Sequence, residues 1–238
     1  MTFWFGVFII IIIVFFYHCW NVVEGFSNRF LTPSETKNLL LSNHDGYYNR
    51  FTADDWAARG LTDSYTELLT NAVYPECPVS SLNKVIEEAD LLISRFNDLE
   101  DGWVYKDKLQ RLPWIIAMSP DGYEFGLPHT RGYVIMLGSV VDADTLVHEK
   151  LHVYQKLYPK DFDVYLRNNG FSLSKLRVPS AANPDSDGQV YECDGVPWYS
   201  YYLKGSDEGF RSVHYKPFDD PRYDCPHEFA VYTLLENK

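Results

Sequence analysis

Thr145-Leu-Val-His148-Glu149-Lys-Leu-His152-Val-Tyr-Gln155 is the stretch that most constrains the fold of this 238-residue chain. Its pattern predicts a helix, in which His148 and His152 lie one turn apart on the same face. Both imidazoles can therefore reach one metal ion. Glu149 lies one step round the helix, close enough to meet a water on that ion but too crowded to be the third ligand.

These residue types at this spacing indicate a catalytic zinc site. Zinc takes nitrogen, oxygen or sulfur donors in a tetrahedron, and a catalytic site leaves one position for water. A neighbouring carboxylate can accept the proton of that water as the water attacks a carbonyl group. Since the chain has 7 His, a bare His-Glu-x-x-His pattern could also arise by chance, so the context matters.

The context of the stretch supports the metal interpretation. Asp142 or Asp144 can cap the start of the helix. The apolar segment Tyr133–Leu137, followed by Gly138, predicts a strand that leads into the helix. The helix itself carries a stripe predicted to be buried, formed by Leu146, Val147, Leu151, Tyr154 and Leu157.

The motif and the strand before it resemble the zincin metallopeptidases. The resemblance covers residues 145–155 and a short segment upstream. It implies an α+β zincin-like domain with a small mixed sheet packed on the motif helix. It also implies one Zn²⁺ per chain, held by His148 and His152, with Glu149 as the catalytic base. Lys150 departs from the family pattern, but helical geometry points it away from the histidine face, where solvent can hydrate it.

Two histidines cannot hold a catalytic zinc alone, so a third ligand is needed. The metzincin pattern His-x-x-Gly-x-x-His is absent, because Gln155 and Tyr158 occupy its last two positions. We predict Glu228, since Pro226 indicates a helix start and the following apolar residues can bury that helix against the motif helix. This arrangement resembles the gluzincins, in which a second helix supplies a glutamate to the metal.

Other roles and other ligands stay open at this stage. Glu228 could instead stabilise the positive end of its helix through its charge alone. The less favoured ligands are Asp161, Asp163, Asp185, Glu192, Asp194 and His214. Candidates for contacts to a substrate or an oxyanion are His129, Arg131, Asn183-Pro-Asp185 and Arg211–Tyr215. The motif together with Pro-His129-Thr and Pro-x-Glu228-Phe-Ala also resembles uncharacterised zincin-like proteins of large DNA viruses.

Residues 1–20 contain no Asp, Glu, Lys or Arg and can cross a bilayer core of about 30 Å as one helix. The long apolar run and the lack of a basic n-region and a cleavage site favour an uncleaved single-pass anchor over a signal peptide. Arg29 and Lys37 follow the span, which favours the cytoplasmic side for the folded part. Outside the span an odd number of cysteines without framework spacing predicts free thiols.

The rest of the chain is predicted to be a juxtamembrane linker, 21–31, followed by a catalytic domain, 32–238, whose first part, 32–78, is helical. Thr32-Pro33-Ser34-Glu35 predicts a capped helix to about Leu41. An amphipathic pattern predicts a core helix over Ser81–Phe96. Further elements are predicted as helices at 54–58, 64–72, 162–167 and 226–236, strands at 114–118 and 133–137, and a loop-rich region at 168–225 in which Tyr199–Tyr202 fits a half-buried strand.

The predicted function is a membrane-anchored zinc metallopeptidase that cleaves a peptide or protein substrate with zinc-activated water. A net charge of −12 without a basic stripe argues against nucleic acid as a partner. The main alternative is a non-catalytic, membrane-anchored binding or structural protein in which zinc is structural or absent. A third possibility keeps the zinc chemistry but replaces the peptide by another amide.

Overall fold

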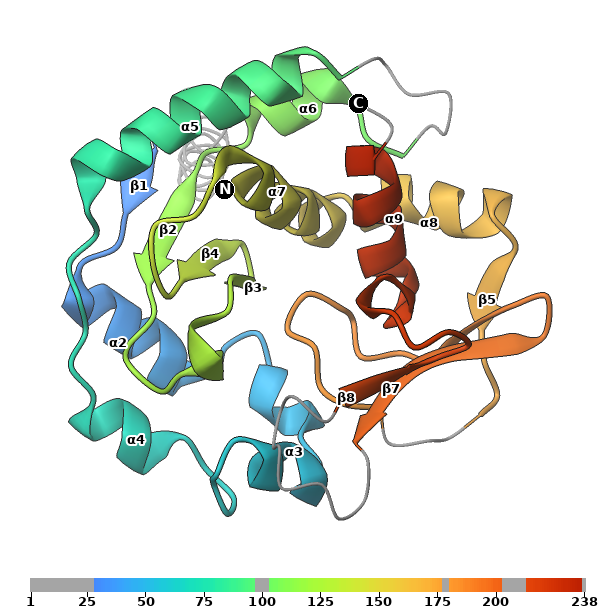
Figure 1. The fold of residues 1–238 in the computed structure, drawn as a ribbon, viewed down its shortest axis with the longest axis horizontal. Coiled ribbons are helices and arrows are strands. Elements are labelled where there is room, and N and C mark those ends of the chain that lie inside the picture. The colour runs from blue at the N-terminus through green and yellow to red at the C-terminus, as the bar shows by residue number, and fades with distance from the viewer. Residues whose placement is uncertain (1–27, 97–102, 177–179, 203–212, 237–238) are drawn as a thin grey trace, which may run out of the picture.

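A computed structural model describes residues 28–96, 103–176, 180–202 and 213–236. Over these residues the chain forms an α+β fold with two four-stranded sheets. In Figure 1 the helices α7 (Ala143–Leu157) and α9 (Pro226–Glu236) lie between the two sheets. The described part contains no helix with the length and apolar character needed to span a bilayer. Residues 1–20, the predicted anchor, lie outside it.

The first sheet is mixed, with the strand order β1-β2-β4-β3. Strands β1 (Arg29–Phe30), β2 (Ile115–Met118) and β4 (Val134–Leu137) run parallel, and β3 (His129–Arg131) is antiparallel to β4 at the edge. The parallel strands β2 and β4 are apolar and almost wholly buried, because helices cover both faces of this sheet. Residues 29 and 30, predicted to belong to a linker, are therefore part of the sheet.

Alternate residues of the strands β2 and β4 pack into two separate cores. Ile116 and Ile135 face the core made with α5 (Val79–Ser94) and α7, whereas Ala117 and Met136 face the core made with α2 (Pro33–Ser42) and α4 (Thr66–Asn71). The motif helix is thus held between its sheet and α5 (Figure 1).

Local sequence signals set the helix boundaries much as predicted. Thr32 and Glu35 form the expected capping box of α2, and Asp142 caps α7 by accepting a bond from Thr145 N at 2.8 Å. The remaining helices are α3 (Ala53–Ala58), α6 (Lys106–Arg111), α8 (Pro159–Asn168) and the single turns η1 (Tyr47–Arg50), η2 (Glu124–Gly126) and η4 (Pro221–Tyr223).

The region predicted to be loop-rich contains the second sheet, so that prediction was wrong. Its antiparallel strands are β5 (Phe171–Leu173), β6 (Tyr191–Cys193), β7 (Val196–Tyr202) and β8 (Val213–Lys216). The frequent prolines of this region favoured a loop prediction, because proline is usually excluded from strands. Here Pro197 nevertheless lies inside β7, opposite Glu192. The half-buried strand predicted for Tyr199–Tyr202 is confirmed as the second half of β7.

Two residues of α7 differ from the predictions. Leu157, expected in the buried stripe, is 44% exposed at the end of the helix. Lys150 points away from the histidine face as predicted, yet it is only 1% exposed and not hydrated. Its Nζ lies 4.0 Å from the ring centroid of Trp114 and 3.7 Å from Asp90 Oδ1. A cation–π contact with Trp114 and an ion pair with Asp90 therefore take the place of solvent around the ammonium group of Lys150.

A buried ion pair joins the N-terminal helices to the turn η2. Arg59 Nη2 donates to Glu124 Oε2 at 3.0 Å, and the two side chains are 1% and 4% exposed. Tyr65 donates to the other carboxylate oxygen at 2.9 Å. Glu124 and Phe125 have φ values of 43° and 57°, which residues other than glycine rarely adopt. The bonds to Glu124 hold this strained turn in place.

Replacing Arg59 by Met should lower the free energy of unfolding by about 3–5 kcal/mol, because Glu124 would stay buried without its cation. Urea denaturation of the full chain measures the change. Arg29→Met is the matched control: its pair with Glu35 has side chains 60% and 41% exposed, and such pairs contribute about 0–1 kcal/mol. Equal losses in the two variants would contradict this role of Arg59.

Candidate metal centre

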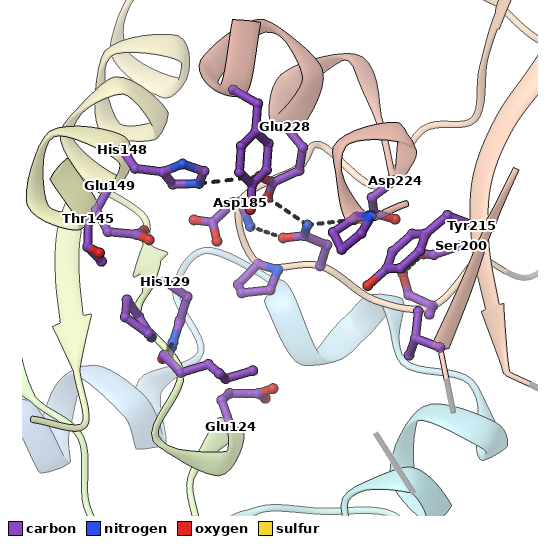
Figure 2. A pocket seen from close by; sticks show the side chains of 18 of the residues that line it. Glu124, His129, Thr145, His148, Glu149, Asp185, Ser200, Tyr215, Asp224 and Glu228 are labelled. Carbon is purple, nitrogen blue, oxygen red and sulfur yellow. Dashed lines mark hydrogen bonds and ion pairs between the residues drawn. The ribbon is translucent and has the colours of Figure 1, made fainter. Parts of the chain in front are cut away.

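Two helices bring the candidate ligands together. His148 and His152 lie on the face of α7 that turns toward α9, because both approach Glu228 in the first turn of α9. Figure 2 shows His148 and Glu228 facing each other. Pro226 is the first residue of α9, as predicted, because proline fits a position where no backbone donor is needed. The apolar residues Val231 and Leu234 pack α9 into the same core as α7.

The three ligand atoms have the separations of a tetrahedral metal site. His148 Nε2 and His152 Nε2 are 3.0 Å apart, and Glu228 Oε2 lies 3.3 and 3.5 Å from them. Zinc with donors at about 2.0–2.1 Å needs those donors about 3.3 Å apart, so one point can lie within bonding distance of all three. This group of His148, His152 and Glu228 could therefore hold a metal ion.

Gln155 sets which nitrogen of His152 faces the site. Its Nε2 donates to the backbone oxygen of His227 at 3.0 Å, and a carbonyl can only accept. The side-chain oxygen of Gln155 must then face His152 Nδ1, which lies 2.9 Å away and donates its hydrogen. The lone pair of His152 is thereby left on Nε2, toward Glu228, as metal binding requires.

Asn183 orients the carboxylate of Glu228 in a similar way. Its Nδ2 donates to Glu228 Oε1 at 3.0 Å and to Asp224 Oδ2 at 2.6 Å. Oε2 is then left to face the histidines. Burial would raise the pKa of Glu228, but His152 and His148 hold it well below its usual range. The carboxylate is therefore charged and ready to bind a cation.

Glu149 lies beside the ligands with one oxygen unused. It is buried, and its Oε2 finds no hydrogen-bond partner among the described residues. Burial raises the pKa of Glu149 well above its usual value, and the carboxylates of Asp185 and Glu228 raise it further. A raised pKa suits a group that must hold a proton for part of a reaction.

The candidate centre opens into a cavity of about 470 Å³. Figure 2 shows His148 and Glu149 on one side of it, Tyr215 and Ser200 on the opposite side, and His129 and Glu124 at another end. The segment 181–185 also lines it. A site of three ligands beside a cavity leaves room for water and a small ligand.

Of the other residues proposed from the sequence as ligands or substrate contacts, some line the cavity and others lie elsewhere. Arg131 does not line the cavity but forms a buried ion pair with Asp45 at 2.7 Å. Asp161 pairs with Lys108 at 2.6 Å and His214 with Asp219 at 2.7 Å, so neither joins the ligand group. Asp163, Glu192 and Asp194 are also outside that group, and Arg211 lies outside the described residues. His129, Asn183, Asp185 and Tyr215 do line the cavity.

Sequence reasoning missed three residues of the centre. Gln155 was visible in the opening stretch, and its position three residues after His152 could have suggested a hydrogen bond. Asp224 and Tyr232 carried no comparable signal. Tyr232 packs its ring against His148, with 5.0 Å between the centroids.

No protein-family model, no curated protein and no solved structure matches this chain. The geometry of the site therefore carries the functional argument.

Replacing Gln155 by Leu should weaken the binding of a divalent metal, with Zn²⁺ as the probe, by about 10–100-fold, because the lone pair of His152 is no longer directed by its neighbour. Competition with a chromophoric chelator measures the affinity. Gln155→Glu keeps an acceptor for His152 Nδ1 and should lose less. Urea unfolding of the metal-free variants is the control. An unchanged affinity in the Leu variant, or a loss that only follows lower stability, would contradict the role of Gln155.

Proposed function

We propose that this chain is a zinc-dependent hydrolase that cleaves peptide bonds, with a zincin-like site of the gluzincin type. The observation that carries the proposal is the convergence of His148 Nε2, His152 Nε2 and Glu228 Oε2 beside a cavity that His148 and Glu228 line. A motif helix below a mixed sheet, an antiparallel edge strand and a glutamate on a later helix together resemble that class.

His148, His152 and Glu228 would hold the metal. Zinc supplies a Lewis acid that polarises a carbonyl group and lowers the pKa of water. Glu149 is the neighbouring base: its free Oε2 accepts a proton from water and later returns it to the nitrogen of the leaving amine. Because Glu149 is already held at the cavity wall, it needs no large movement for either transfer.

Two tyrosines of the cavity are suited to donate to a developing oxyanion. Burial raises the pKa of Tyr232 to about 12 and also raises that of Tyr215, so both hydroxyls keep their protons at neutral pH. Tyr215 belongs to β8 and Tyr232 to α9, and both line the cavity. A neutral hydroxyl aimed at such a charge stabilises the transition state more than the substrate.

The site favours a catalytic role over a structural metal. Structural zinc sites are closed by four protein ligands, whereas here three ligand groups converge next to a cavity. The unused oxygen of Glu149 has no evident structural purpose but fits a base. Cleavage of a peptide rather than another amide is the part of the proposal that rests on the zincin resemblance alone.

The membrane anchor is a separate part of the proposal. Its support is the uncharged apolar composition of residues 1–20, with a cytoplasmic-side domain favoured by Arg29 and Lys37. The full chain should stay in the membrane fraction after an alkaline carbonate wash. A soluble protein that begins near residue 21 would instead show a cleaved signal peptide.

Glu149→Gln should keep zinc and abolish hydrolysis, because the amide has nearly the same shape but cannot accept a proton. The assay is cleavage of a peptide library by the full chain, with zinc measured by mass spectrometry. His148→Ala is the comparison and should lose both zinc and activity. If the Gln variant cleaves as fast as the parent, Glu149 is not the base.

A further inference from the structure

The edge strand beside the site has no free backbone groups at its centre. Thr130 is the middle residue of β3, opposite Ile135 of β4. Its N–H donates to Asp185 Oδ1 at 2.7 Å, and its C=O accepts from Lys156 Nζ at 3.2 Å. Because both partners lie outside the sheet, both groups point away from β4. The edge that a further strand would pair with is already occupied.

The segment that occupies this edge, residues 180–186, is fastened to several elements. Lys156 of α7 donates to Pro184 O at 2.7 Å. Arg50 of η1 donates to Ser186 O at 2.8 Å and to Asn183 O at 3.2 Å. Ala182 N donates to the buried Asp55 of α3 at 2.8 Å. These bonds come from three different elements, so the segment is a fixed wall of the cavity.

A blocked edge excludes the usual way of binding an extended peptide. Such a peptide adds a strand to a sheet edge and takes its affinity from main-chain hydrogen bonds. Here the peptide would have to displace Asp185, which is buried and would lose its bonds to Thr130. Leaving a buried carboxylate without partners costs more than a new main-chain bond returns.

The cavity itself limits what can bind. Its volume of about 470 Å³ lies in the range of sites that enclose small ligands. Among the described lining residues there are carboxylates, such as Asp144 and Asp224, but no Lys or Arg. A free terminal carboxylate would therefore meet like charges, whereas an amino group or a basic side chain would meet opposite ones.

We propose that the substrates of this site are short peptides of about two to four residues, bound within the cavity, and not extended polypeptides paired with β3. The inference rests on the proposed hydrolase function and names its substrate class. Asp185 is the group that enforces the limit, because it holds the N–H that an incoming strand would need.

The test is a binding experiment on the full chain carrying Glu149→Gln, loaded with zinc. Calorimetry compares amidated Lys/Ala peptides of two, four and ten residues from one nested sequence. We expect the ten-residue peptide to bind less than tenfold more tightly than the four-residue peptide. Two added main-chain bonds would give about tenfold or more, so a gain of that size would overturn the inference. Failure of every length to bind would overturn it as well.

Asp185→Ala in the same background frees Thr130 N–H for one main-chain bond and should raise the preference for the ten-residue peptide by about threefold or more. Asp144→Ala is the matched control, since it removes the same charge from the lining without touching the edge. An equal preference in both variants would overturn the role of Asp185. If Asp185→Ala does not fold, the length series alone decides.

Hydrolysis by the parent chain tests the proposed function separately. If the four-residue peptide binds to the Gln variant but the parent does not cleave it, the proposed function fails while the size limit stands. If the parent cleaves the ten-residue peptide with the higher kcat/KM, the size limit fails while the hydrolase function stands.

Discussion

Three electron-rich atoms lie close together where α7 and α9 pack against each other. The surrounding structure must offset their mutual repulsion and hold them in place. Two imidazole nitrogens and a carboxylate oxygen lie within 3.5 Å of one another. Buried groups of this kind need a positive charge among them. In the metal-free chain a proton on His152 supplies one, since burial opposes its charge but Glu228 raises its pKa to about 9. A divalent cation supplies a stronger one and fits the same space.

The surrounding bonds keep the three atoms in this arrangement. Gln155 ties His152 to the backbone of α9, and Asn183 ties Glu228 to the wall segment 180–186. Arg59 reaches the same segment by donating to Ala182 O at 3.3 Å, while its main partner is Glu124 at the far end of the cavity. The ligands, the wall and the N-terminal helices therefore form one connected polar network around the cavity. Loosening one member should disturb both metal binding and substrate binding.

The sequence predicted the parts of the fold that depend on local rules. Helix α7 could be placed from its spacing and its Asp142 cap, α5 from its apolar periodicity, and α9 from Pro226. Choosing Glu228 required only the rule that zinc needs a third ligand, together with a helix start able to present one. The convergence of that residue with His148 and His152 agrees with the choice.

The parts that could not be predicted depend on contacts between distant segments. The second sheet was missed because its strands are short and lie among frequent prolines, and because pairing between distant segments stabilises them. Lys150 was expected in solvent, yet it contacts Trp114 and Asp90, which belong to other parts of the chain. Asp185 looked like a distant candidate ligand, and only the fold shows that it caps Thr130. No local pattern encodes such long-range partners.

X-ray absorption at the zinc edge of the purified full chain tests the central claim most directly. The account predicts a first shell of nitrogen and oxygen donors only, at about 2.0–2.1 Å, with the outer-shell scattering of two imidazoles. The imidazole signal should fall in His148→Ala and persist in His214→Ala. A sulfur shell at about 2.3 Å, which would indicate a cysteine ligand, or a spectrum unchanged by His148→Ala, would contradict the account.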